Sequence, residues 1–261
     1  MIEAFNLDGK VAFITGAGRG IGRGIAAVLA EAGAEIAINA LTETHAAVTA
    51  EEIKAATGKD VLVALGDVTT TSGVAAVTDQ VMARFGRIDI LVNNLGDAIR
   101  TPLVALPDAG GEGISDEALQ RIVDLNMTAT VLCTRAVAPQ MLERRAGKII
   151  NISSYTAGSG GSGVVIYSMA KAAVVGFTRA QAQEWAGQGI NVNVIAPGLY
   201  PEPRTLTEER AAQLAGWAKK RIPLGRTGEL REPGYLALYL ASAASDYMTG
   251  QTLYLDGGMS L

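Results

Sequence analysis

Tyr167 and Lys171 stand four residues apart in the segment YSMAK, and their side chains carry a phenol and an ammonium group. On an α-helix, residues i and i+4 lie on the same face, so the two groups would be neighbours. A free phenol has a pKa of about 10, and a nearby cation favours its ionised form. The pair therefore indicates either an ordinary solvated helix surface or a proton donor with the group that tunes it.

Glycines crowd the end of the first predicted strand, in the segment TGAGRGIG at residues 15–22. Gly16, Gly20 and Gly22 leave room for a pyrophosphate to approach the backbone and the N-terminus of the next helix. A glycine-rich string alone is typical of plain turns, but this one follows a strand and opens a helix. The segment therefore predicts a dinucleotide-binding site.

Short β-branched runs alternate with helical stretches along the chain. The predicted strands are residues 10–15, 35–39, 60–65, 89–94, 148–153, 190–196 and 252–256, and the predicted helices are residues 21–32, 44–56, 70–85, 115–145, 167–186 and 229–241. Apolar strands separated by helices indicate a parallel sheet that is covered on both faces. We therefore expect an α/β protein, a single Rossmann domain over residues 1–261 with a doubly wound parallel sheet of about seven strands.

Two segments interrupt this alternation. Residues 105–115, ALPDAGGEGIS, form a loop with glycines and acidic residues ahead of a long predicted helix. Residues 197–229 begin with several prolines and continue into a helical stretch. Long excursions of this kind are often lids or binding loops, and the alternative is an ordinary surface insertion. We expect the second excursion, about 197–228, to be a substrate loop or lid.

The composition favours a folded protein of the cytoplasm. Hydrophobic residues make up 49% of the chain and charged residues 18%, which argues against disorder. The net charge of −4 gives no indication of a nucleic-acid partner. No basic and apolar leader and no apolar window of about 18 residues is present, so we expect no membrane span. The single cysteine, Cys133, excludes an intrachain disulfide and fits a reducing compartment.

Metal chemistry is not expected. His45 is the only histidine and cannot form a metal site alone, and no metal-ligand spacing or Ser/His/Asp set is present. Cys133 follows Asn126 by seven residues and lies on the same face of the predicted helix. We interpret it as a small hydrophobic residue buried in the core.

Several short motifs occur in a set order along nearly the whole chain. They are TGAGRGIG at 15–22, NNLG at 93–96, NISS at 151–154, Tyr167 with Lys171, PG at 197–198, and the ending ASDYMTGQTLYLDGG. Their order and combination resemble the short-chain dehydrogenase/reductase family, and the overall pattern resembles its 3-oxoacyl-ACP reductase subgroup.

This resemblance implies a catalytic set of Asn126, Ser154, Tyr167 and Lys171. Tyr167 would supply or remove the proton of the substrate oxygen, and Ser154 would hydrogen-bond that oxygen, with Ser153 as the alternative hydroxyl. Lys171 would favour the ionised phenol and donate hydrogen bonds to the nicotinamide ribose. Asn126 would hold a water in a proton relay, or would serve only as a kink residue of its helix.

The cofactor is expected to be NADP(H) rather than NAD(H). Rossmann units that select NAD end their second strand with an acid that holds the ribose 2′-hydroxyl, and Ala40 stands at that place here. Arg19 in the glycine loop could pair with a 2′-phosphate, and Thr42 could add a hydroxyl contact. The cofactor contacts implied by the resemblance are Gly16, Arg19, Gly20, Ile21, Gly22, Ala40, Leu41, Thr42, Asp67, Val68, Asn93, Gly96, Tyr167, Lys171, Pro197 and Gly198.

The substrate cleft departs from the family pattern. Its candidate wall residues are Asp97, Ile99, Tyr155, Val164, Leu199 and Tyr200, a mixture without a charged anchor of obvious purpose. Leu95 stands where the family mostly has alanine. The family often has a threonine soon after PG that touches the nicotinamide carboxamide, but the run LYPEPRT follows here. We interpret Glu202 and Arg204 in this run as solvated, with contact to a polar substrate as the alternative.

The resemblance implies an NAD(P)-dependent oxidoreductase that transfers a hydride between nicotinamide and a carbonyl or secondary alcohol, and it favours reduction of a 3-oxoacyl thioester. A sugar, polyol or cyclic alcohol dehydrogenase is the alternative. A non-redox lyase-like relative and a cofactor-binding regulator belong to other classes, and the intact glycine loop and catalytic set argue against them. An enoyl reductase relative would space its tyrosine and lysine more widely. The resemblance also implies a homotetramer paired through long helices.

Overall fold

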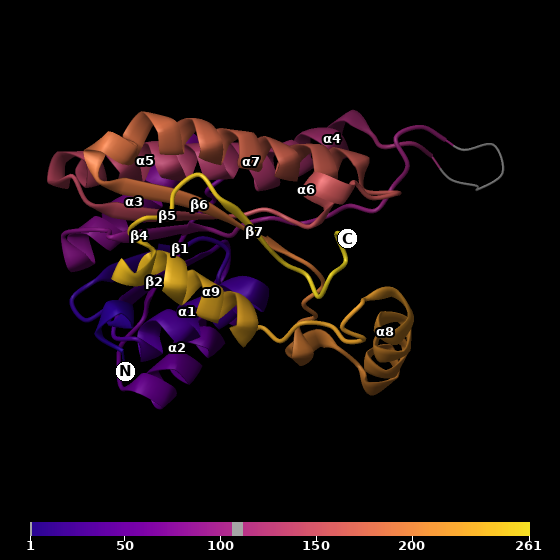
Figure 1. Cartoon of the computed structure of the whole chain (residues 1–261), viewed down its shortest axis with the longest axis horizontal. Helices are drawn as coiled ribbons and strands as arrows, with labels where there is room; N and C mark the ends of the chain where they lie inside the picture. Colours follow the sequence, from indigo (N-terminus) through magenta and orange to yellow (C-terminus); the bar gives the residue numbers. More distant parts are fainter. Residues whose placement is uncertain (1, 106–111) are drawn as a thin grey trace.

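One parallel sheet organises the protein, whose computed structural model describes residues 2–105 and 112–261. Residues 106–111 of the predicted loop 105–115 lie outside the described part. The strands are β1 Val11–Ile14, β2 Glu35–Ala40, β3 Leu62–Leu65, β4 Ile90–Asn93, β5 Gly147–Ile152, β6 Ile190–Pro197 and β7 Thr252–Leu255. Their order is β3-β2-β1-β4-β5-β6-β7, and every pair is parallel (Figure 1). The predicted doubly wound sheet of seven strands is confirmed.

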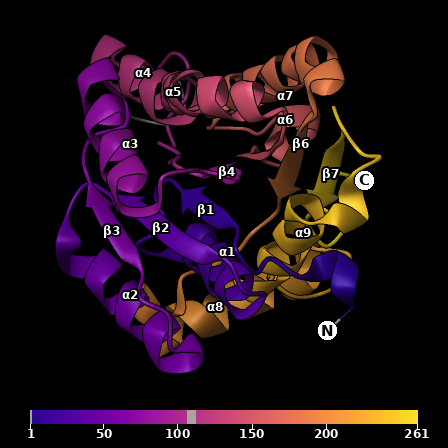
Figure 2. The same ribbon diagram turned by 90° about the vertical axis from the view of Figure 1, so that its left-hand side faces the viewer.

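Helices cover both faces of this sheet (Figures 1 and 2). One face carries α1 Gly20–Glu31, α2 Glu43–Thr57 and α9 Arg231–Ala241, and the other carries α3 Thr71–Phe85, α5 Ala129–Arg144 and α7 Val165–Trp185. The shorter helices α4 Asp116–Val123 and α6 Thr156–Ser159 lie on the side of α5 and α7 (Figure 1). The described helix boundaries lie within a few residues of the predicted ones.

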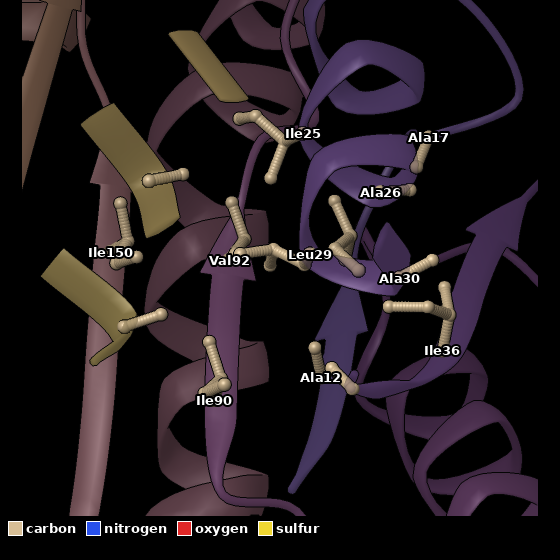
Figure 3. Close-up of a cluster of buried hydrophobic side chains, with 14 of the residues drawn as sticks. Ala12, Ala17, Ile25, Ala26, Leu29, Ala30, Ile36, Ile90, Val92 and Ile150 are labelled. Carbon is tan, nitrogen blue, oxygen red and sulfur yellow. The ribbon is translucent and has the colours of Figure 1, made fainter. Parts of the chain in front are cut away.

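Two apolar clusters join the three layers. Side chains of a strand alternate between the two faces of a sheet, so β1 contributes Ile14 to one cluster and Phe13 to the other. The first cluster includes Leu29 of α1 and Val92 of β4 (Figure 3), and the second includes Val137 of α5. Full burial of each such side chain contributes about 1.5–3 kcal/mol. The packing therefore holds the carboxyl ends of the strands in a fixed arrangement.

The predicted helix 115–145 is interrupted by a π-helical turn at Asp124–Thr128, between α4 and α5. Within it, the Asn126 side chain donates a hydrogen bond from Nδ2 to the carbonyl oxygen of Ile122 at 2.9 Å. That carbonyl is one that a regular helix would bond through its own backbone. Such π-turns are frequent at functional sites. The interruption sets the position of Asn126.

The excursion 197–228 begins where β6 ends and contains α8, Glu208–Arg221, which lies apart from the two helix layers (Figure 1). The Thr207 hydroxyl caps α8 by accepting a hydrogen bond from the amide of Arg210. The two ends of the excursion meet, because the amide of Gly228 donates to the carbonyl of Leu199 at 3.0 Å. The segment is thus a closed loop beside the sheet edge.

Candidate active site

The main cleft lies at the carboxyl edge of the sheet. Chain order reverses between β1 and β4, because β2 and β3 lie on one side of β1 while β4 to β7 lie on the other. Ligands of open α/β sheets bind at such a switch point. A cleft of about 680 Å³ is found here, lined by the loops that follow β1, β4, β5 and β6.

The cleft brings most of the predicted site residues together. Those that line it are Gly16, Arg19, Gly20, Ile21, Ala40, Leu41, Thr42, Gly96, Asp97, Ser154, Tyr167, Lys171, Pro197, Gly198 and Tyr200. Those that lie outside its lining are Gly22, Asp67, Val68, Asn93, Ile99, Asn126, Tyr155, Val164 and Leu199. Residues 16–22 and 167–171 are far apart in the chain, and the fold places both segments on one cavity.

Five side chains on the cleft were not predicted to line it. They are His45, Asn94, Arg121, Leu125 and Ile152. Leu125 directly precedes Asn126, and Arg121 lies one helical turn earlier, so the same face of the helix carries both to the cleft. His45 lies in the first turn of α2, just after Thr42. Each of these residues lies close in the sequence to a predicted site residue, and that closeness could have indicated it.

The glycine loop is held in place by its neighbours. The Thr15 hydroxyl accepts hydrogen bonds from the amides of Asn94 at 3.0 Å and Leu95 at 3.1 Å. In return, Asn94 Nδ2 donates to the carbonyls of Thr15 and Gly16 at 2.9 and 3.0 Å. Gly16 has a positive φ of 62°, and a Cβ added there would lie 3.0 Å from the Cα of Leu95. Glycine is therefore required at this position.

A carboxylate from the excursion lies on the N-terminus of α1. The amide of Gly20 donates to Glu202 Oε2 at 2.6 Å, and the amide of Arg204 donates to Glu202 Oε1 at 3.1 Å. Partial burial raises the pKa of Glu202, but these two hydrogen bonds outweigh it and hold the pKa below its ordinary value. Arg204 itself pairs with Glu52 and donates to the Thr49 hydroxyl. The interpretation of Glu202 and Arg204 as solvated is wrong, because helix amides attract a carboxylate.

Lys171 is fixed at the end of the cleft that Ser154 and Tyr167 line. Its side chain is buried, and Nζ donates to the carbonyl of Ile152 at 3.0 Å. The Ser153 hydroxyl donates to the backbone carbonyl of Lys171 at 2.7 Å. Burial lowers the pKa of Lys171 to about 8. Ser153 is therefore committed to positioning the lysine, which leaves Ser154 as the hydroxyl free to meet a substrate.

Tyr167 stands one helical turn before Lys171 on α7. The ammonium nitrogen of Lys171 lies 5.7 Å from the centre of the Tyr167 ring. Burial raises the pKa of the Tyr167 phenol, and the negative charge of Asp97 raises it further. A hydrogen bond with the Ser154 hydroxyl lowers the pKa, but by less than burial raises it. In this state burial outweighs the tuning expected from Lys171. The phenol therefore holds its proton at neutral pH.

Ser154 ends the turn after β5 and is buried. Its Oγ accepts hydrogen bonds from the amide and from the hydroxyl of Thr156, at 3.2 and 3.0 Å. A serine hydroxyl has one proton to donate and two lone pairs. Both acceptor positions are filled, so the proton is left for a group in the cleft.

Asn126 lies behind the cleft and supports it. Its Nδ2 donates to the carbonyl of Asp97 at 2.8 Å, while its buried Oδ1 has no hydrogen-bond partner among the described residues. A Cβ on Gly96 would lie 2.6 Å from that Oδ1 and 2.8 Å from Lys171 Nζ. Gly96 therefore lets the amide oxygen and the ammonium approach each other. A buried acceptor without a partner is typical of a site that holds a water.

Other predicted contacts have structural partners. The Asn93 side chain is buried and donates from Nδ2 to Asn151 Oδ1 at 2.8 Å and to the Thr134 hydroxyl at 2.9 Å. Asp67 accepts from the amide and the hydroxyl of Thr69, at 2.9 and 2.6 Å, which closes a turn after β3. Val68 is 2% exposed and belongs to a core cluster. In this structure these side chains stabilise the cleft from outside it.

Among the residues that the structure describes, no carboxylate lines the end of the cleft beside β2. Ala40, Leu41 and Thr42 line it together with Arg19 and His45. The side chains of Arg19, Leu41 and Thr42 are exposed, so a ligand could reach them. A cation and a hydroxyl at this place suit a phosphate.

The candidate substrate walls divide into two groups. Tyr200 lines the cleft, and its hydroxyl donates to the carbonyl of Leu255 at 2.8 Å, so it offers its ring rather than its hydroxyl. Leu199 lines a smaller cavity beneath the excursion. Tyr155 and Val164 flank α6, where the amide of Tyr155 donates to the carbonyl of Pro197 at 3.0 Å. This bond ties the loop between β5 and α7 to the end of β6, and Val164 is buried.

Neither a metal cluster nor a membrane span is found in the described part of the chain. No group of three His, Cys, Asp or Glu side chains there could hold a metal ion. None of the helices it contains is both long and apolar enough to cross a membrane. Cys133 is buried in a core cluster, and burial raises the pKa of its thiol to about 12.

The residues of the cleft fit a nicotinamide dinucleotide. Gly16 and Gly96 are positions that a Cβ would fill, so backbone is exposed to a ligand at both. The amide of Gly20 already binds an anionic oxygen, that of Glu202, at the N-terminus of α1. Ser154, Tyr167 and Lys171 lie further along the same cleft.

Comparison with known proteins gives matches over almost the whole chain. A family model described as enoyl-(acyl carrier protein) reductase matches residues 16–260. The 3-oxoacyl-[acyl-carrier-protein] reductase FabG of Vibrio cholerae serotype O1 is 37% identical over 257 residues, which are 97% of this chain and 98% of that protein.

Two solved structures are similar in both sequence and fold. A short-chain type dehydrogenase/reductase from Mycobacterium marinum has a TM-score of 0.87 and 39% identity, and the match covers 99% of this chain and 98% of that one. A gluconate 5-dehydrogenase from Burkholderia cenocepacia, solved in complex with NADP and tartrate, has a TM-score of 0.85 and 38% identity, with the same coverage of 99% and 98%.

Proposed function

The chain belongs to the short-chain dehydrogenase/reductase family, and from this premise we propose that it uses NADP(H) to reduce a 3-oxoacyl thioester. As a member of the family, it is an oxidoreductase that acts on CH–OH and C=O groups and takes a nicotinamide cofactor. The proposal rests on one observation, that Ser154, Tyr167 and Lys171 meet in the cleft that also contains the glycine loop. We assign residues 1–261 to one dinucleotide-binding domain, with 197–228 as its lid.

Proton transfer to the substrate oxygen is assigned to Tyr167. A bound nicotinamide supplies or accepts the hydride. Because burial raises the pKa of Tyr167, the phenol is protonated at neutral pH and can donate its proton to a carbonyl oxygen. Ser154 directs its free proton at the same oxygen and polarises the carbonyl.

Lys171 and Asn126 are assigned supporting roles. The ammonium beneath the Tyr167 ring stabilises the phenolate left by proton donation. The unpartnered Oδ1 of Asn126 would accept a hydrogen bond from a water, through which a proton returns to the phenol. Gly96 keeps the space between Asn126 and Lys171 open.

The choice of NADP(H) is supported by the end of the cleft beside β2. Ala40 stands where an acid would hold a ribose 2′-hydroxyl, and Arg19 and Thr42 line the same place. The absence of a carboxylate at these positions removes the repulsion that a 2′-phosphate would meet. The Burkholderia cenocepacia relative was solved with NADP.

The thioester substrate is supported by the apolar lining near the catalytic group. Leu95, Leu125, Ile152 and Pro197 line this part of the cleft, and Tyr200 adds its ring. An apolar wall suits an acyl chain, and an open cleft suits a substrate carried on a long arm. The four-residue spacing of Tyr167 and Lys171 supports carbonyl rather than enoyl reduction.

Oxidation of a sugar acid at a secondary alcohol is the second candidate. Arg121 and Asp97 line the cleft, and a guanidinium binds a carboxylate well. The relatives include a gluconate 5-dehydrogenase and a 2-dehydro-3-deoxy-D-gluconate 5-dehydrogenase. A sugar, polyol or cyclic alcohol dehydrogenase thus remains an alternative within the family.

A substrate screen tests the proposal. Purified protein is assayed with NADPH and NADH against acetoacetyl-CoA, 5-ketogluconate and cyclic ketones, and with NADP⁺ and NAD⁺ against gluconate and polyols. We expect the highest kcat/KM for acetoacetyl-CoA with NADPH. Turnover of gluconate alone, lost in Arg121→Ala, would favour the second candidate. Failure to bind either reduced cofactor would overturn the redox function and leave a lyase-like or regulatory role.

A homotetramer of the cytoplasm is also proposed. The outer face of α7 exposes Val165 and Met169, at 44% and 52%, and Tyr254 of β7 is 44% exposed. Exposed apolar residues on a long helix and on the edge strand support pairing through both surfaces. Sedimentation at several concentrations measures the assembly. The buried, single Cys133 supports a reducing compartment.

A further inference from the structure

The carboxylate of Glu202 occupies the place on α1 where a dinucleotide-binding helix receives a phosphate. Its Oε2 accepts from the amide of Gly20 at 2.6 Å, and its side chain is 11% exposed. Its Oε1 accepts from the amide of Arg204 at 3.1 Å and lies 3.5 Å from Arg23 Nη2. Gly20 has a positive φ of 62°, and a Cβ there would meet nothing within 4 Å. The contact therefore joins the carboxylate of Glu202 in the proposed lid to the turn at Gly20, where space for a ligand remains.

A second tie fixes this part of the lid independently of Glu202. Arg204 pairs with Glu52 of α2 and donates from Nη1 to the Thr49 hydroxyl at 3.3 Å. Arg23 of α1 also pairs with Glu52, at 3.0 Å. Two arginines and two carboxylates thus join the lid to α1 and α2. The Arg204 tie does not use the amide of Gly20, so it can persist when Glu202 moves.

A pyrophosphate and the Glu202 carboxylate cannot share one helix N-terminus without cost. Both are anions that bind the amide of Gly20, and two negative charges at one helix N-terminus repel each other. The hydrogen bonds that lower the pKa of Glu202 also keep it ionised at neutral pH. Binding of a dinucleotide must therefore break the contact between Gly20 and Glu202, or bear the repulsion.

We propose that Glu202 is an internal competitor of the cofactor, which occupies the phosphate site in the free protein and is displaced when a dinucleotide binds. This inference rests on the proposed function, because it assumes that the cleft takes a nicotinamide cofactor. Because the pyrophosphate is common to both cofactors, Glu202 lowers the affinity for NADPH and NADH equally. It also links cofactor binding to the lid, since residues 199–207 connect the Gly20 contact with Tyr200 and α8.

Cofactor affinity in matched variants tests the proposal. Glu202→Gln keeps the shape of the side chain but removes its charge, and we expect NADPH and NADH each to bind about tenfold more tightly, measured by cofactor fluorescence. Glu52→Gln is the control, because it removes the same charge from the same arginines without touching Gly20. Its effect should stay below about twofold. Equal tightening in both variants would indicate a general charge effect and overturn the proposal.

Hydrogen exchange supplies a readout that does not depend on turnover. In the wild-type protein, saturating NADP⁺ should speed exchange of the Arg204 amide, which loses its acceptor on Glu202. A cofactor-free Glu202→Ala variant, which has no side-chain acceptor for this amide, should show faster exchange at the same peptide, with a folded state verified by thermal unfolding. Unchanged exchange in both experiments would overturn displacement. A wild-type protein that binds neither cofactor would instead refute the proposed function.

Discussion

The two ends of the cleft are held in different ways: the proposed catalytic end around Ser154 and Tyr167, and the proposed phosphate end around Gly20. At the catalytic end, Lys171 and Ser153 are bound to backbone carbonyls of β5 and α7, and both side chains are buried. At the phosphate end, the backbone amide of Gly20 donates to the carboxylate of Glu202, which belongs to the excursion 197–228. The buried hydrogen bonds of Lys171 and Ser153 hold the proposed catalytic side chains in place before a substrate binds. Glu202 lies on a loop outside the helix layers, so a ligand can replace its carboxylate on Gly20.

The largest effect is expected at the catalytic end. Tyr167→Phe removes the only proton donor assigned to the substrate oxygen, and kcat should fall about 10³-fold. Because Lys171 and the glycine loop are untouched, the dissociation constant for NADPH should change by less than about twofold. Steady-state kinetics and fluorescence titration measure the two quantities. Residual activity within tenfold of the wild type would remove Tyr167 from this role.

The next effect tests how tightly the catalytic end is packed. Gly96→Ala places a Cβ 2.6 Å from Asn126 Oδ1 and 2.8 Å from Lys171 Nζ, so one of these groups must shift. A displacement of about 1 Å can cost about 10²-fold in rate, and we expect a loss of that order in kcat.

Gly187→Ala is the matched control, since a Cβ there meets nothing within 4 Å and the residue lies in the short 3-10 helix Ala186–Gln188, outside both the cleft lining and α7. Alanine is also the better helix former, so this variant should keep its activity and gain some stability. If both variants keep wild-type kcat, the packing around Gly96 has no catalytic consequence.

At the phosphate end, Arg19 is expected to discriminate between the two cofactors. A charge-assisted hydrogen bond to a phosphate contributes about 1.5–3 kcal/mol, so Arg19→Ala should weaken NADPH about thirtyfold. NADH lacks the 2′-phosphate and serves as the control, with a change below about twofold. Fluorescence titration with both cofactors measures the ratio. Equal losses for the two would refute the assignment of Arg19 to the 2′-phosphate.

The two ends also differ in how far the sequence predicts them. The strands and helices follow from local patterns, and the motifs at strand ends meet because parallel strands present their carboxyl ends at one edge. Ser154 follows such a strand end, whereas its meeting with Tyr167 and Lys171 of α7 was predicted from the family resemblance. The contact of Gly20 with Glu202 spans 182 residues and depends on where the lid returns, which no local pattern encodes. Likewise, a buried Asn93 follows from tertiary packing against Asn151.

The smallest effect concerns the cost of burying Lys171 at the catalytic end. Burial lowers its pKa from the ordinary 10.5 to about 8 in the folded state. Between those two values the unfolded chain holds a proton that the folded protein has released, so stability rises with pH. The cost of the buried charge is full below pH 8 and is relieved above it.

Urea unfolding of the cofactor-free protein at two pH values measures this relief. From about pH 7 to about pH 9, the wild type should gain about 1 kcal/mol of unfolding free energy relative to Lys171→Met, which has no proton to release. The difference between the two proteins isolates the lysine, because other titrating groups contribute equally to both. An identical change in wild type and variant would mean that Lys171 titrates near its ordinary pKa, and that the catalytic end is less shielded from water than its hydrogen bonds indicate.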